Sequence, residues 1–220
     1  MPADDPILDE VPPSVRRWLN THFELVSIVI MSLTAILTAW SGFQGARWTT
    51  IQTDTYALAT DAQAESVRAS NTADEQLSID LVVFTSWLSE RNGGNTDAAQ
   101  FIYDRFPDRL RVATDAWLEL DPFEDPDAPP SPFAMEEYVR PPELRAEELA
   151  VSAEEYTLAA QEAAQRANEY VLTTVLFATV LFFASISSKL TGVGNRWGLL
   201  SVSILGLIAG AVILLAFPSA

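Results

Sequence analysis

Residues 36–54 read ILTAWSGFQGARWTTIQTD and pass from an apolar to a polar composition without a proline. Two glycines, a glutamine and an arginine lie between Trp40 and Trp48. The fold depends on what happens here, because an uninterrupted helix through this stretch would carry the chain out of a membrane and into water. The same residues are also suited to lining a pore or to contacting a partner.

Three segments are apolar enough to cross a bilayer, and we assign them to residues 24–43, 170–188 and 197–217. Each supplies about the 20 apolar residues that a spanning helix needs. Apart from Glu24 at the start of the first segment, none contains Asp, Glu, Lys or Arg. The first segment is too long for the apolar region of a cleaved signal peptide, so we expect a retained signal anchor.

The basic residues near the span ends predict the orientation. One side of the membrane would carry Arg16, Arg17, Lys189 and Arg196. The opposite side would carry only Arg47 and Arg166 next to the spans. We therefore expect the cell inner (plasma) membrane, with residues 1–23 and the turn 189–196 cytoplasmic, and with residues 44–169 and the C-terminus extracytoplasmic.

Most of the charge lies in residues 44–169, which hold nine arginines and 25 acidic side chains, a formal charge of −16. Such a segment repels phosphates, so a nucleic-acid partner is not expected. A cationic partner or a divalent-cation atmosphere stays open. The chain has no cysteine, which excludes disulfides and thiolate metal sites.

Residues 46–92 and 143–169 contain neither glycine nor proline and are rich in helix formers. They predict two arms of a helical hairpin. Small side chains recur along both arms, at Ala62, Ser66, Ala69 and Ala73 and at Ala153, Ala160, Ala164 and Ala167. This recurrence favours a packed antiparallel pair or multi-helix stalk over solvated single helices.

Residues 93–142 form the predicted tip of the hairpin. The turn signal of residues 91–97 precedes a helical pattern that Pro107 should divide into two short helices. An irregular acidic loop rich in proline follows, and its aromatic side chains Phe123, Phe133 and Tyr138 are expected to fasten it to the tip. The predicted fold class is therefore all-α, with three transmembrane helices and a long extracytoplasmic helical hairpin between spans 1 and 2.

Catalytic chemistry is not indicated. His22 is the only histidine, and no glycine-rich phosphate loop follows a strand. His22 and Glu24 suggest a proton switch, but a polar pair at headgroup level is the commoner interpretation. Calcium could bind to an acidic run, which consists of Asp121, Glu124, Asp125 and Asp127. This run lacks the ligand spacing of an EF-hand, so a solvated loop is favoured. We predict no enzyme, no cofactor and no metal.

Small residues within the spans predict close helix packing. In the first span they recur every four residues, at Thr34, Thr38, Gly42 and Ala46. In the third span Gly206 and Gly210 form a G-x-x-x-G pair. The predicted function is a membrane scaffold or interaction protein, in contact with membrane lipid, that self-associates as a homo-oligomer or joins a larger membrane complex.

The alternative function is an oligomeric cation-conducting channel. Its pore would be lined by polar residues of the first span, Thr34, Thr38, Ser41 and Gln44. The acidic outer segment would concentrate cations at its mouth. Against this alternative, no charged residue lies at membrane depth, and three spans enclose a pore only as an oligomer.

The stretch at the end of the first span resembles one found in a family of small, uncharacterised bacterial membrane proteins with three predicted spans. The matching residues are Ala39, Trp40, Gln44, Ala46, Arg47 and Trp48. The resemblance also covers the polar helical insert and the paired C-terminal spans in outline. It implies the same architecture and carries no activity with it.

The resemblance leaves two interpretations of residues 40–48. Trp40 and Trp48 could form an aromatic belt, with Arg47 at the lipid phosphates. Alternatively, the stretch is an assembly interface, here called the seam. Trp40 and Gln44 would make polar contacts there, beside a helix surface of small residues that lets another helix approach closely. We favour the seam.

Overall fold

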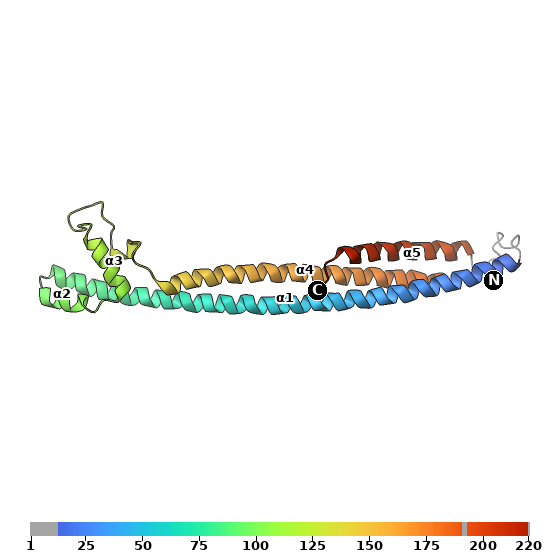
Figure 1. Ribbon diagram of the computed structural model, residues 1–220, viewed down its shortest axis with the longest axis horizontal. Coiled ribbons are helices and arrows are strands. Elements are labelled where there is room, and N and C mark those ends of the chain that lie inside the picture. Colours follow the sequence, from blue (N-terminus) through green and yellow to red (C-terminus); the bar gives the residue numbers. More distant parts are fainter. Residues whose placement is uncertain (1–12, 191–192, 220) are drawn as a thin grey trace. The chain divides into compact units, whose positions relative to one another are not determined.

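The computed structural model describes the backbone of residues 13–190 and 193–219, and the side chains of residues 22–190 and 194–219. The fold is all-α, as predicted, with 84% helix and no strand among the described residues. The helices of this part of the chain are α1 (Pro13–Asn92), α2 (Thr96–Tyr103), α3 (Asp108–Leu118), the 3₁₀ turn η1 (Pro132–Ala134), α4 (Pro141–Ser187) and α5 (Val193–Ala216) (Figure 1).

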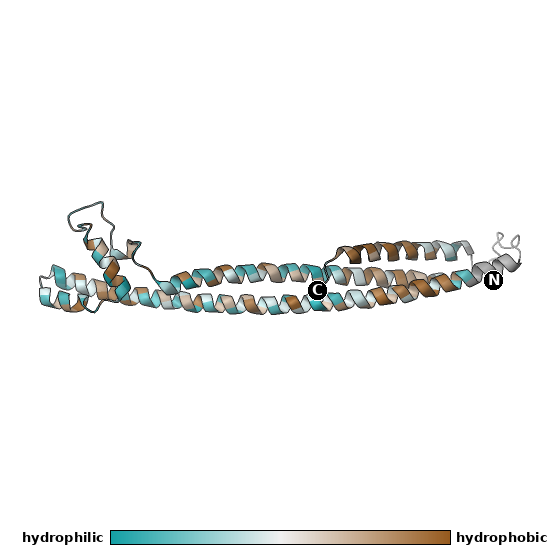
Figure 2. Ribbon diagram, in the orientation of Figure 1, coloured by the Kyte–Doolittle hydropathy of each residue, from teal (hydrophilic) through white to brown (hydrophobic). Residues whose placement is uncertain are grey.

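Three of these helices, α1, α4 and α5, are long and apolar enough to cross a membrane. Their apolar parts stand out in Figure 2, where the rest of α1 and α4 is more hydrophilic. This agrees with the three predicted spans. The helices extend beyond them, since α1 already begins at Pro13 and α5 at Val193. Helix ends follow backbone hydrogen bonding and capping, whereas span ends follow hydropathy.

The helix α1 continues without a break through residues 36–54. The two glycines in this stretch each lower helix stability by about 1 kcal/mol relative to alanine. That is too little to end a helix whose segments before and after the stretch are both packed. Several threonine hydroxyls after the apolar part bond to their own helix, as Thr49 Oγ1 does to the Gly45 carbonyl at 3.0 Å. Along this stretch the side chains change from apolar to polar, while the backbone keeps its helical hydrogen bonds.

The ends of the long helices follow proline and glycine. α1 ends at Asn92, and Gly94 then adopts a φ of +76°, which glycine tolerates without strain. α4 begins at Pro141, two residues before the predicted arm. A proline at a helix start gives up only an N–H that has no helical partner there, so Pro141 and Pro142 fit inside the first turn.

The described chain divides into two compact units, and α1 and α4 contribute to both. Of the described residues, the first unit comprises 13–56, 158–190 and 193–219. Within it, helices α1, α4 and α5 pack around a shared apolar core (Figure 1). The buried members of this core are Phe23, Ile30, Phe177, Val180, Ala184, Leu200 and Leu207.

Close approach of α5 to α4 depends on the two glycines of the G-x-x-x-G pair. A Cβ atom added at Gly206 would lie 2.8 Å from Val180 Cγ2, and one added at Gly210 would lie 2.6 Å from Phe177 Cε1. Both distances are shorter than carbon atoms tolerate. Phe177 is fully buried and cannot easily move aside. The pair thus packs within one chain.

We predict that Gly210→Ile lowers the stability of the first unit by about 1–3 kcal/mol or more, because the added side chain overpacks the Phe177 site. Gly198→Ile is the matched control, since Gly198 lies on the same helix and an added Cβ would meet nothing within 4 Å. Thermal unfolding in a mild detergent measures the difference. Equal melting temperatures for the two variants would contradict the packing.

The second unit comprises residues 57–157. Here α1 and α4 meet through small side chains. Ser66 Oγ donates to the Ala146 carbonyl at 2.8 Å, and just before α4 the longer side chain of Arg140 donates from Nη1 to the Ala73 carbonyl at 3.3 Å. The buried residues along these two helix faces are Ala59, Ser66, Ala73, Ala146 and Ala153. The predicted small-residue stripes at residues 62–73 and 153–167 therefore overlap the buried faces of α1 and α4.

An aromatic cluster fills the rest of this unit. α2 and α3 are separated at Pro107, as predicted, and pack with the end of α1. The buried members of the cluster are Phe84, Trp87, Ala99, Phe106, Leu110 and Trp117. The acidic loop is fastened to it by the expected aromatic side chains: Phe133 meets Phe84 edge to face at 5.4 Å, and Phe123 meets Trp117 at 5.6 Å.

Candidate functional site

The polar residues of the first span are the first candidate site, and the structure separates them into two groups. Thr34, Ser41 and Gln44 are buried within the first unit, and Thr38 and Trp48 are partly buried. The other predicted seam residues, Trp40, Gly42 and Ala46, are exposed. The predicted set is therefore not one continuous surface of this chain.

The four-residue stripe fails to stay on one face because of helix geometry. Each step of four residues turns about 40° past a full rotation in a helix of 3.6 residues per turn. Three such steps, from Thr34 to Ala46, carry the stripe about a third of the way around the helix. The buried face instead follows alternating steps of three and four residues: Phe23, Ser27, Ile30, Thr34, Leu37, Ser41, Gln44 and Trp48.

Gly45 is a contact residue that the four-residue pattern missed. A Cβ atom there would lie 3.3 Å from Tyr170 Cβ and 3.7 Å from the Ala167 carbonyl oxygen, so α1 and α4 approach closely at this level. Ser41 Oγ donates to the Tyr170 carbonyl at 2.9 Å one turn away. The alternating three- and four-residue spacing of Ser41, Gly45 and Trp48 is the sequence signal that would have identified it.

The threonine hydroxyls of this span bond locally. Thr34 Oγ1 donates to the Ile30 carbonyl at 2.6 Å, and Thr38 Oγ1 donates to the Thr34 carbonyl at 2.7 Å. Such bonds satisfy the hydroxyl within its own helix. Thr34 and Thr38 therefore need no partner from another helix.

Gln44 and Trp48 differ from the threonines. Gln44 is 1% exposed, and its Oε1 has no hydrogen-bond donor among the described residues. One turn along the same helix face, the Nε1–H of Trp48 is buried without an acceptor there. The guanidinium of Arg166 lies over the Trp48 ring, 5.2 Å from its centroid. These groups form a polar layer of α1 and α4 next to the apolar core.

The second candidate site is a buried ion pair in the second unit. Asp80 is fully buried, and both of its oxygens accept hydrogen bonds from Arg109, at 2.7 and 2.9 Å. Tyr138 Oη donates to Asp80 Oδ2 at 2.8 Å. Burial, together with this bond to a carboxylate, raises the pKa of Tyr138 to about 12. The tyrosine therefore stays protonated and links the loop to α1.

Tyr103 repeats this arrangement on the same tip. Its hydroxyl donates to Asp115, and burial followed by that bond raises its pKa to about 12. One bond joins α2 to α3 and the other joins the loop to α1, which is a structural role.

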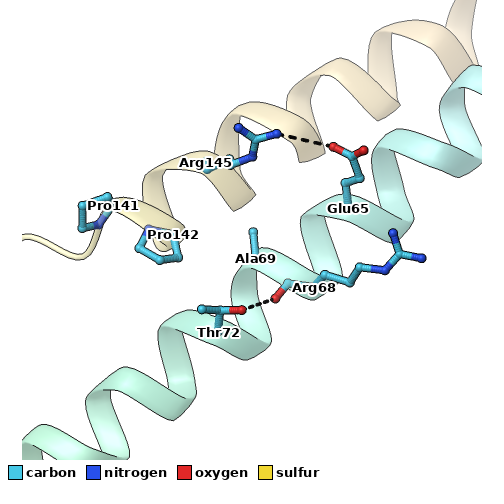
Figure 3. Close-up of a pocket in the computed structure, with 7 residues that line it drawn as sticks. All are labelled: Glu65, Arg68, Ala69, Thr72, Pro141, Pro142 and Arg145. Atoms are coloured by element: carbon cyan, nitrogen blue, oxygen red, sulfur yellow. Dashed lines mark hydrogen bonds and ion pairs between the residues drawn. The ribbon is translucent and has the colours of Figure 1, made fainter.

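The third candidate site is a cavity of about 560 Å³ between α1 and α4 in the second unit. It is lined by Ala69, Thr72, Pro141 and Pro142, together with the charged residues Glu65, Arg68 and Arg145 (Figure 3). Arg145 reaches across from α4 to Glu65 at 3.6 Å. Both partners of this pair are largely exposed, so the pair contributes little to stability.

Among the residues that the structure describes, no three His, Asp or Glu side chains are grouped to hold a metal ion. The acidic run of the loop bonds to itself instead, with Asp125 Oδ1 accepting from the Asp127 backbone N–H at 2.9 Å.

Comparison of the chain with protein-family models, with curated proteins and with solved structures finds no match. The resemblance at residues 39–48 stays a prediction.

The unpaired Gln44 amide generates a test. We predict that Gln44→Leu raises the free energy of unfolding by about 1 kcal/mol, because a buried amide oxygen without a donor is replaced by an apolar group of similar size. Ser41→Ala is the control and should lower it by about 0.6 kcal/mol, the average for hydrogen bonds inside membrane proteins. Denaturant titration in detergent measures both. A Gln44→Leu loss larger than that of Ser41→Ala would mean that the amide has a partner in the membrane.

Proposed function

We propose that this chain is an integral membrane scaffold or interaction protein that presents an acidic helical hairpin on the extracytoplasmic side. It would self-associate or act as a subunit of a larger membrane complex. One observation carries the proposal: α1 and α4 each join an apolar, membrane-length segment to an acidic segment within a single unbroken helix. Such a helix attaches the acidic segment covalently to a membrane anchor.

The contacts of the polar groups support a scaffold over an enzyme. Asp80 is consumed by an ion pair and a tyrosine, and the hydroxyls of the spans bond mostly to carbonyls of their own helix. A catalytic site instead needs titratable groups that converge on a shared space. The cavity between α1 and α4 is lined by exposed arginines and one glutamate, and its only hydroxyl, that of Thr72, bonds to the Arg68 carbonyl.

The exposed side of the first span is the surface proposed for self-association. Trp40 and Phe43 are 49% and 54% exposed there, and Gly42 and Ala46 make the helix thin beside them. A Cβ added at Gly42 would meet nothing within 4 Å, so packing of the described chain does not require this glycine. A second helix with small residues of its own could approach closely at this position.

The channel alternative has weaker support. Thr34, Ser41 and Gln44 are buried inside a single chain, and Ser41 is already bonded to α4. To line a pore shared between copies, they would have to leave that packing. We therefore advance the scaffold as the proposed function.

The orientation can be mapped by single-cysteine labelling, since the chain has no cysteine of its own. We expect Asn71→Cys, at an exposed position of α1, to react with a membrane-impermeant maleimide in intact cells. Ser188→Cys, exposed just after α4, should react only after permeabilisation. The reverse pattern would invert the proposed topology, and labelling of both in intact cells would contradict membrane crossing by α4.

Self-association at the outward surface generates a further prediction. Gly42→Ile should reduce the particle in lipid nanodiscs from an oligomer to a single chain, with melting temperature unchanged, because the added side chain separates the helices without touching the protomer core. Gly198→Ile serves as the control at another open position. Mass photometry reads the result. A wild-type particle that is already a single chain would overturn self-association and leave the role of subunit in a larger complex.

A further inference from the structure

A polar cavity of about 300 Å³ lies on one face of α4, within the first unit. Its lining residues are Glu162, Gln165, Arg166 and Glu169. Tyr170 follows directly and is the first residue of the second proposed span. In the proposed topology the cavity therefore opens among the lipid headgroups.

The cavity contains one cation, and α1 holds it in place. The Arg166 guanidinium lies 5.2 Å from the centroid of the Trp48 ring. Among the described residues it forms no ion pair with either neighbouring carboxylate. Stacking on a ring occupies the flat face of a guanidinium and leaves the N–H groups at its edge free to donate. Carboxylates and phosphates both match this donor set, and the phosphate is the one that lipid headgroups supply.

Two carboxylates lie about one turn to either side of this arginine, Glu162 further from the proposed span and Glu169 next to it. Side chains one turn apart on a helix are separated by about 5–6 Å. The cavity thus carries a net charge of −1, with a cationic centre between two acceptor groups. A headgroup with only negative charge would be repelled, whereas one with both charges would pair at two points.

We propose that this cavity binds the headgroup of a phospholipid that carries a primary ammonium, such as phosphatidylethanolamine. Arg166 holds the phosphate, and the ammonium donates to Glu162, with Gln165 beside it. The order fits the depth of these groups, because Arg166 lies about 6 Å and Glu162 about 12 Å along α4 from Tyr170. In a lipid, the ammonium likewise lies beyond the phosphate. This inference rests on the proposed membrane insertion.

The same geometry sets the selectivity. A primary ammonium has three N–H donors for carboxylate and amide oxygens. A trimethylated choline has none and pairs by charge alone. A glycerol headgroup has no positive charge and places its phosphate between two carboxylates. The expected order of binding is ethanolamine, then choline, then glycerol headgroups.

The test uses the full-length protein reconstituted from equal amounts of the three phospholipids. Native mass spectrometry then counts the lipids retained on the released protein. Phosphatidylethanolamine should be enriched about two- to fivefold over phosphatidylcholine, the ratio expected for one exposed ion pair. Glu162→Gln should remove this enrichment, and Arg166→Gln should reduce retention of every phospholipid.

Two further variants make the result specific. Glu169→Gln should raise retention of phosphatidylglycerol, because it removes a repelling charge next to the phosphate. Glu155→Gln is the matched control, an exposed acid one heptad from Glu162 and outside the cavity, and should leave all ratios unchanged.

The outcomes separate this inference from the proposed function. Wild-type protein that inserts into the bilayer without an ethanolamine preference would overturn the headgroup site and leave the scaffold proposal standing. An enrichment that survives in Glu162→Gln, or that disappears equally in Glu155→Gln, would also overturn it. Protein that fails to enter the bilayer would overturn both.

Discussion

The close approach of α1 and α4 through small side chains is the constraint on which the rest of the structure depends. In the first unit it occurs where Gly45 faces Tyr170 and Ser41 bonds to the Tyr170 carbonyl. In the second unit it occurs where Ser66 bonds to the Ala146 carbonyl. A serine or alanine contributes little buried area, so each contact is weak by itself. Repetition every three or four residues, together with hydroxyl-to-carbonyl bonds between helices, compensates for the small side chains.

Small contact residues also explain where the charges lie. A helix pair with an alanine seam has a narrow dry strip, and every other position of a polar segment faces water. Most of the acidic side chains between residues 44 and 169 occupy such positions. Asp80 is the exception, since it is fully buried, and two hydrogen bonds from Arg109 and one from Tyr138 satisfy it. Without those three donors a charged carboxylate in that position would be strongly unfavourable.

Composition was enough to predict the helices. Long stretches free of glycine and proline lie within α1 and α4, Gly94 follows the end of α1, and Pro107 directly precedes the start of α3. The pairing of α1 with α4 could not be predicted with the same accuracy. It depends on which of two overlapping spacings sets the buried face of α1, a step of four residues or alternating steps of three and four. Gly42 and Gly45 look alike in the sequence, yet only Gly45 has a neighbour within 4 Å. The bond from Tyr138 to Asp80 joins residues 58 positions apart, and no local pattern specifies it.

The two tryptophans of residues 36–54 have different surroundings, which bears on both interpretations of that stretch. Eight residues turn a helix by about 80° beyond two full rotations, so Trp40 and Trp48 do not share a face. Trp40 is half exposed and its ring lies tilted against that of Phe43, with 6.0 Å between the centroids, whereas Trp48 lies under the Arg166 guanidinium of α4. An aromatic belt requires only that both rings lie at headgroup depth. It does not explain why the two rings point in different directions. One ring lies on the outward side of α1 near Gly42, and the other lies under an arginine that lines a polar cavity, so a single helix segment supplies both an exposed contact surface and a support for a charged group.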